Sequence, residues 1–201
     1  MPSRTASTMR CCASVSERVV RALAILALTL VALRGEADDG TIRYAEIIAG
    51  EDGYVVNADI EFELNPRLTE LVSRGVSLHF VAEFQIERPR WYWSDETVLQ
   101  RRLSYRISYH SITRSYRLSI GSLHQSFDSL DAALRTMQRV RNWRIVELDG
   151  LEPGVSYNAS LRMRHDTSLL PRPFLVTAIG SSEWAIGTDW QRWTFLAGGS
   201  R

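Results

Sequence analysis

The chain has 201 residues, with 24 basic and 23 acidic side chains and a formal charge of +1 at pH 7. This balance disfavours nucleic acid as a partner, because nucleic-acid-binding domains are usually strongly basic. The two cysteines, Cys11 and Cys12, both precede the first predicted strand. Disulfides, cysteine metal ligands and a thiolate nucleophile are therefore excluded from the rest of the chain.

The first 37 residues have the pattern of an export signal. Four arginines precede an uncharged apolar run over residues 22–33, and small residues follow at 35 and 37. The run is shorter than the roughly 20 residues that span a bilayer. We expect residues 1–37 to be an export signal or, alternatively, an N-terminal membrane anchor through which membrane contact is made. Residues 38–201 are then a single domain in the periplasm or on the periplasmic face of the inner membrane.

The first half of this domain alternates apolar and polar residues. Strands are predicted over residues 41–49, 54–64 and 76–86, each with one face in a core and one in water. On the last of these, His79, Glu83 and Gln85 are predicted to point outward, on the face expected in water. Between the second and third strands, Asn65-Pro66 predicts the start of a short helix that ends at Gly75.

The second half adds a second helix and more strands. Apolar residues at helical spacing predict a helix from Asp128 or Ser129 to Val140, with Arg139 and Arg141 at its distal end. Strands are predicted over residues 98–109, 112–120, 123–127, 143–148, 157–165, 174–179 and 184–195.

Residues 151–157, Leu-Glu-Pro-Gly-Val-Ser-Tyr, resemble the tyrosine corner of fibronectin type III and related immunoglobulin-like domains. In that motif the tyrosine hydroxyl bonds back to the turn that precedes it. Many strands without a βαβ rhythm point to the same class. The predicted fold is mainly β, an antiparallel β-sandwich of immunoglobulin/fibronectin-III-like architecture with two short helices.

Charge is unevenly distributed along the domain. Residues 38–87 carry eleven acids and three arginines, whereas residues 88–144 carry eleven arginines and four acids. One interpretation is that acidic and basic strands lie side by side and pair across the sheet. The other is a basic face for an anionic partner. The near-neutral total favours the first.

No catalytic constellation stands out. A nucleophile elbow of the Gly-x-Ser-x-Gly kind is missing. The four histidines, at positions 79, 110, 124 and 165, lack the spacing of a zinc site. His165-Asp166 is either an orienting pair or the end of a strand. We predict no catalytic residue, no metal and no cofactor.

Unusual side chains gather between Glu87 and Glu96, where three consecutive aromatics lie between arginines and an acidic pair. Such residue types are enriched at the energetic centres of binding surfaces. The aromatics either form an exposed platform for a ligand or plug one end of the sandwich. Paired carboxylates beside aromatics also occur in glycosidases.

The chain resembles an uncharacterised proteobacterial family of exported proteins, domain of unknown function 4390. The residues that carry the resemblance are 57–64, 83–93, 103–119, 157–164 and 170–174, with Trp184 and residues 189–190. The resemblance implies an exported or membrane-anchored protein without an assigned activity. It also implies a gene context near an envelope sensor kinase.

We therefore expect a non-enzymatic binding or accessory protein of the bacterial cell envelope. Its partner would be an envelope protein or an anionic or carbohydrate ligand. One alternative is an envelope carbohydrate hydrolase using Glu87 with Asp95 or Glu96, and another is a periplasmic partner of a membrane sensor. The predicted contact residues are Arg88, Arg90, Trp91, Tyr92 and Trp93, supported by Arg102, Arg106 and Arg117.

Overall fold

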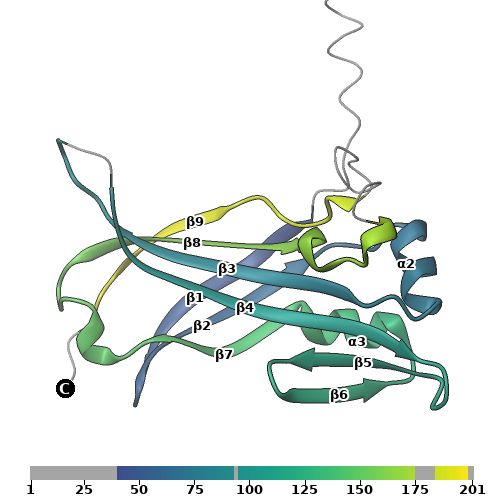
Figure 1. Cartoon of the computed structure of the whole chain (residues 1–201). Coiled ribbons are helices and arrows are strands. Elements are labelled where there is room, and N and C mark those ends of the chain that lie inside the picture. The colour runs from purple at the N-terminus through teal and green to yellow at the C-terminus, as the bar shows by residue number, and fades with distance from the viewer. Residues whose placement is uncertain (1–39, 93–94, 175–183, 199–201) are drawn as a thin grey trace, which may run out of the picture. The chain divides into compact units, whose positions relative to one another are not determined.

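The computed structural model describes residues 40–92, 95–174 and 184–198. Within these ranges the strands form two antiparallel sheets (Figure 1), one of order β1-β2-β7 and one of order β6-β5-β4-β3-β8-β9. The strands are β1 (Thr41–Gly50), β2 (Gly53–Glu61), β3 (Leu78–Arg88), β4 (Glu96–His110), β5 (Ser115–Ile120), β6 (Leu123–Phe127), β7 (Arg139–Val146), β8 (Ser156–His165) and β9 (Gln191–Leu196). The predicted mainly antiparallel β-architecture is confirmed, whereas an immunoglobulin-like topology is not.

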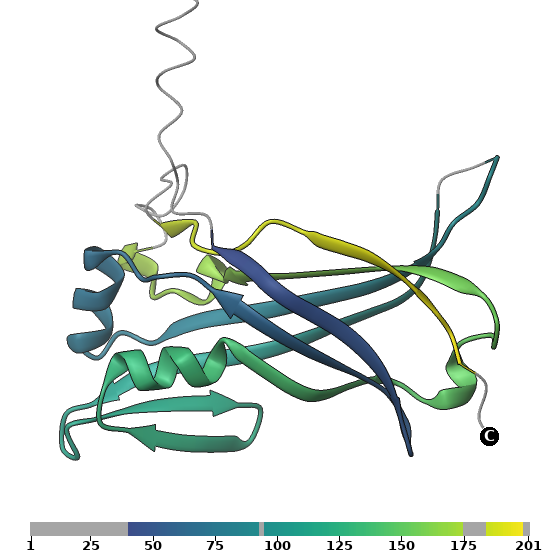
Figure 2. The same ribbon diagram turned by 180° about the vertical axis from the view of Figure 1, so that it is seen from behind.

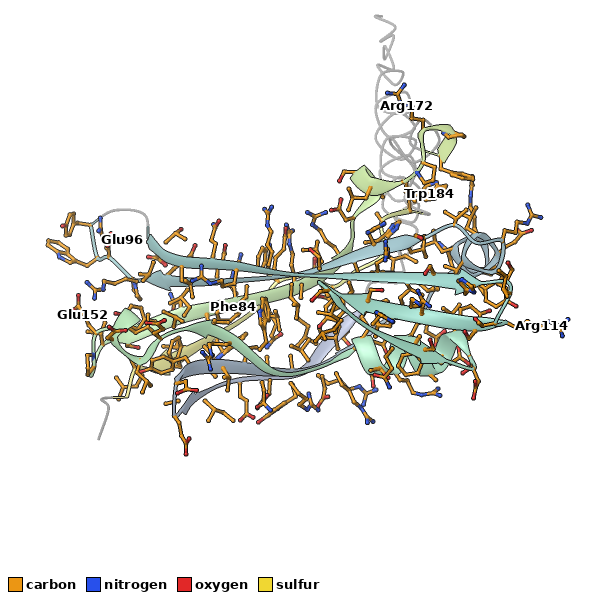
Figure 3. All side chains as sticks on the ribbon, turned by 60° about the horizontal axis from the view of Figure 1, so that its bottom comes forward. Phe84, Glu96, Arg114, Glu152, Arg172 and Trp184 are labelled. Atoms are coloured by element: carbon orange, nitrogen blue, oxygen red, sulfur yellow. The ribbon has the colours of Figure 1, made fainter. Side chains whose placement is uncertain are left out.

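The core lies between the two sheets. Along β2 the residues Tyr54, Val56, Ala58 and Ile60 are all buried, as the alternation predicts. Phe84 on β3 points toward the other sheet (Figure 3), where its ring lies 6.1 Å from that of Trp143 on β7. These inward-facing side chains hold the two sheets together.

Two short α-helices lie at the same end of the sheets, away from the link between β3 and β4 (Figures 1 and 2). Helix α2 (Pro66–Ser73) begins where the Asn65 side chain accepts the Leu68 backbone N–H at 2.9 Å. Helix α3 (Leu130–Met137) begins where the Ser129 hydroxyl accepts the Ala132 N–H at 3.2 Å. Both predicted helices are confirmed, and 3₁₀ turns η1 (Leu148–Gly150) and η2 (Thr167–Leu169) flank β8.

The predicted end of the second helix is wrong. The helix stops at Met137, and Arg139 and Arg141 belong to β7. Strand β7 pairs with β2, and this pairing places Val140 in the core and Arg141 beside Asp59. Tertiary hydrogen bonding therefore outweighs the local helical pattern.

Other strand predictions change in extent, and one falls largely outside the described residues. The strand expected over 112–120 begins at Ser115, because residues 111–114 form a turn in which Arg114 has a φ of 51°. The strand expected over 184–195 is confined to β9, and Trp184 is buried against Phe174 at 6.2 Å between rings. The strand expected over 174–179 lies, beyond Phe174, outside the described residues.

Cross-strand ion pairs join acidic and basic stretches of the chain, as the charge distribution predicts. Asp59 on β2 pairs with Arg141 on β7, and Asp52 pairs with Arg144 at 3.1 Å.

In the described ranges no helix is both long enough and apolar enough to cross a membrane.

Candidate functional site

The link between β3 and β4 carries two exposed aromatic side chains, which we call the aromatic tip: Trp91 and Tyr92. Trp91 is 94% exposed and Tyr92 is 67% exposed. Their rings meet edge to face with 5.1 Å between centroids. A tryptophan usually buries 150–250 Å², so this exposure is unusual. It excludes Trp91 as a plug of the sandwich and leaves the exposed platform. Trp93 lies outside the described residues.

Ion pairs and hydrogen bonds fix the base of this tip. The Arg90 guanidinium pairs with Glu96, which Figure 3 labels, and the Arg90 backbone N–H donates to Asp95 at 3.4 Å. Asp95 also accepts the Asn158 amide of β8 at 3.4 Å. Asp95 and Glu96, two of the three carboxylates named for a hydrolase, are therefore engaged with neighbouring groups at exposed positions. The third, Glu87, lies on β3 opposite Thr97 of β4 and Asn158 of β8.

Arg88 lies within the fold and anchors the base of the same hairpin. Its Nη2 donates to the Tyr157 hydroxyl at 3.1 Å and pairs with Glu152 at 2.7 Å. The Tyr157 hydroxyl also accepts the Glu152 backbone N–H at 3.1 Å, which is the bond expected of a tyrosine corner. The Glu152 and Tyr157 hydrogen bonds raise the pKa of Arg88 above its ordinary value. Arg88 thus ties β3 to the β7–β8 connection.

The three supporting arginines lie apart from the tip. Arg102, Arg106 and Arg117 are on the outer face, the face of the six-stranded sheet that is turned away from β1, β2 and β7. From Glu96 to Arg106 strand β4 rises about 33 Å, at roughly 3.3 Å per residue. The predicted contact residues therefore form two surfaces.

One of these surfaces contains a pocket that sequence reasoning missed. Glu83 on β3 lies opposite Arg102 on β4 and Arg162 on β8, and Arg164 follows on β8. All three arginines contact the Glu83 carboxylate, at 3.4, 2.6 and 3.1 Å respectively. The Trp190 ring stacks on the Arg162 guanidinium at 4.4 Å. We call this group the basic pocket, and its volume is about 270 Å³.

Glu83 points outward as predicted, but the expectation of a solvated strand face is wrong here, because only 8% of its side chain is exposed. The carboxylate does point to the outer face, but the arginines cover it. Burial opposes its ionisation, yet hydrogen bonds from Arg164 and Arg162 outweigh burial and hold the pKa of Glu83 below its ordinary value. The alternation of Arg162 and Arg164 in the sequence was a signal for a basic stripe. Their partner, Glu83, lies 79 and 81 residues away along the chain, so the local sequence contained no sign of the ion pairs.

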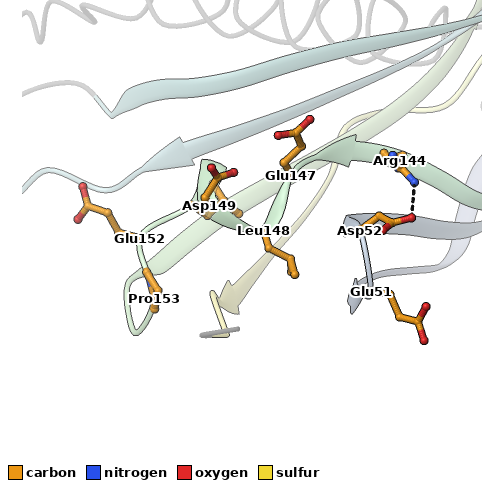
Figure 4. A pocket seen from close by; sticks show the side chains of 9 residues that line it. Glu51, Asp52, Arg144, Glu147, Leu148, Asp149, Glu152 and Pro153 are labelled. Carbon is orange, nitrogen blue, oxygen red and sulfur yellow. Dashed lines mark hydrogen bonds and ion pairs between the residues drawn. The ribbon is translucent and has the colours of Figure 1, made fainter. Parts of the chain in front are cut away.

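An acidic pocket of about 830 Å³ lies where the β1–β2 turn approaches the β7–β8 connection (Figure 4). Five carboxylates line it, and one of them, Asp52, pairs with Arg144. The carboxylates are spread along the rim in Figure 4. No group of three or more histidine, cysteine or acidic side chains in the described part of the chain is placed to hold a metal ion.

His165 and Asp166 form separate contacts. The buried His165 ring donates from Nδ1 to the Trp184 carbonyl at 2.9 Å, and burial lowers its pKa. The Asp166 carboxylate accepts the Ser168 backbone N–H at 3.1 Å and its hydroxyl at 2.6 Å. The pair ends a strand, which was one of the two interpretations of the sequence.

Comparison with known proteins places this architecture in a family. No curated protein and no solved structure matches the chain. A family model with the description domain of unknown function, DUF4390, matches residues 37–194. This match spans both sheets, the aromatic tip and the basic pocket, and the chain therefore belongs to the DUF4390 family.

Proposed function

We propose that this protein is an exported, non-enzymatic binding or accessory module of the cell envelope, and that it binds a partner protein through the aromatic tip. It acts in the periplasm or on the periplasmic face of the inner membrane. A membrane sensor protein is one such partner. The basic leader and short apolar run of residues 1–37 support export.

The exposure of Trp91 carries this proposal. Sites for small ligands are concave, whereas Trp91 and Tyr92 lie on a hairpin that extends past the neighbouring strands (Figures 1 and 2). A projecting aromatic pair is buried most completely by a concave surface on a macromolecule. Tryptophan, tyrosine and arginine are also the residue types that dominate binding energy at protein interfaces.

The contacts at the base favour binding over hydrolysis. Glycoside hydrolysis needs two carboxylates that flank a sugar-binding cleft. Asp95 and Glu96 instead hold the Arg90 backbone and side chain, and so support the tip. An anchored tip loses less conformational entropy when it binds.

The test is affinity capture from native membranes with the wild type, Trp91→Ala and Arg90→Ala. Ile112→Ala is the matched control, because Ile112 is 88% exposed in the turn at the other end of β4. A protein recovered reproducibly is then purified and its Kd measured with each variant. We expect Trp91→Ala to weaken binding about 30-fold, as for a central interface residue, and Ile112→Ala to change it less than twofold.

Equal affinity for the wild type and Trp91→Ala would remove the aromatic tip from the interface. Recovery of glycan fragments in place of a protein would contradict the proposed protein partner and would identify a carbohydrate as the ligand.

A further inference from the structure

The basic pocket has more positive charge than its own carboxylate can neutralise. Arg102, Arg162 and Arg164 converge on Glu83, and this group carries a formal charge of +2. Among the described residues Glu83 is the one carboxylate within 4 Å of these three guanidinium groups.

The arginines keep donors for a ligand. Each guanidinium has five N–H groups. Arg162 directs Nε and Nη2 to one Glu83 oxygen, at 2.7 and 2.6 Å. Arg164 uses Nη2 at 3.1 Å, and the Arg102 Nε lies 3.4 Å from the carboxylate. The Arg102 side chain is 72% exposed and lines the pocket, so its guanidinium is accessible to a ligand there.

The same contacts hold Arg162 and Arg164 in place before any ligand arrives. Glu83 is buried on a central strand, and Trp190 stacks on Arg162. Ordered side chains lose less entropy on binding than free ones, so the affinity per contact rises. Glu83 acts here as a positioning residue.

We propose that the basic pocket binds a phosphoryl dianion. A dianion matches the residual charge of +2, which a single carboxylate would leave half neutralised. Arginine pairs with phosphate through two parallel hydrogen bonds, and tetrahedral oxygens can meet guanidinium groups from β4 and β8, the two strands that flank β3. A pocket of about 270 Å³ holds the phosphoryl group and leaves its substituent in solvent. This site is separate from the aromatic tip and does not depend on the partner proposed for it.

The test is calorimetric titration of the full chain with inorganic phosphate at about pH 8 and low ionic strength, compared with succinate. We expect saturable phosphate binding, weaker binding of succinate, and a loss of at least tenfold in affinity in Arg102→Gln. Arg139→Gln is the charge-matched control, because Arg139 is exposed on β7 of the other sheet. It should change the affinity less than twofold. Thermal unfolding shows that each variant is folded, and Arg164→Gln replaces Arg102→Gln if the latter does not fold.

Vesicles distinguish the two sources of a phosphoryl group. If the protein binds phosphatidylcholine vesicles that contain phosphatidic acid, and Arg102→Gln loses this binding, the ligand is a lipid headgroup. Binding of inorganic phosphate without vesicle binding assigns a soluble ligand. No saturable phosphate binding, equal weakening by Arg139→Gln, or succinate affinity equal to that of phosphate would each overturn the proposal.

Discussion

Glu83 is the residue whose surroundings differ most from the expectation of a solvated strand face. Its carboxylate is ionised although buried, because three guanidinium groups surround it. A buried charge is tolerated only where such partners compensate for its lost hydration. The residue therefore serves the stability of the sheet and the geometry of the basic pocket together.

Replacing Glu83 by Gln keeps the shape of the side chain and removes its charge. We expect the free energy of unfolding at pH 7 to fall by about 2 kcal/mol, less than for a fully buried pair because the arginines are partly exposed. Urea unfolding measures this loss. The exposed Glu63 gives the control, and Glu63→Gln should change stability by less than about 0.5 kcal/mol.

The difference in unfolding free energy between the wild type and Glu83→Gln should depend on pH. The folded pKa of Glu83 lies below the ordinary value of 4.5. Its ionisation therefore contributes stability that is complete above pH 4.5 and is lost as the pH falls through the folded pKa. The stability gap between wild type and Glu83→Gln should narrow below that pH. A gap that stays constant down to about pH 3 would contradict the role assigned to the carboxylate.

At the scale of elements, Tyr157 joins three parts of the chain. Its hydroxyl accepts a backbone N–H from the β7–β8 connection and a guanidinium N–H from Arg88 at the end of β3. The aromatic tip begins three residues beyond Arg88, at Trp91. The tyrosine corner thus supports the hairpin that carries the proposed interface.

Removing this hydroxyl in Tyr157→Phe should lower the free energy of unfolding by about 1–2 kcal/mol, because the Glu152 N–H loses its acceptor. Chemical denaturation provides the measurement. Tyr105→Phe is the control, since Tyr105 is also buried but its hydroxyl makes no hydrogen bond among the described residues. Equal effects of the two substitutions would show that the corner bond contributes no stability.

At the scale of the whole molecule, residues 37–201 form one compact unit without cysteine. A core closed by two sheets does not need a disulfide when a domain of this size buries roughly 70% of its unfolded surface. The stability of the domain should therefore come from packing alone.

A chain that begins at Ala37 should unfold in a single cooperative transition, with the same urea midpoint in the presence and absence of a reducing agent. Circular dichroism and tryptophan fluorescence should report coincident curves. Loss of cooperativity on removal of residues 1–36 would mean that these residues contribute to the folded core.

The sequence by itself determined the features that depend on neighbours along the chain. Alternation placed the buried face of β2, Asn65 and the pair Asp128-Ser129 marked the helix starts, and residues 151–157 marked the tyrosine corner. These signals are local, because strand faces and caps follow from spacing of a few residues.

Only the tertiary structure decided which distant residues meet. Placing β3 between β4 and β8 buried Glu83 and gathered the basic pocket, and pairing of β7 with β2 ended helix α3 at Met137. The tertiary structure also decided that Trp91 is exposed, since the same aromatic run is compatible with a buried plug of the core and with an exposed platform. Burial and charge pairing depend on which strands become neighbours, and a single sequence does not contain that order in its local spacing.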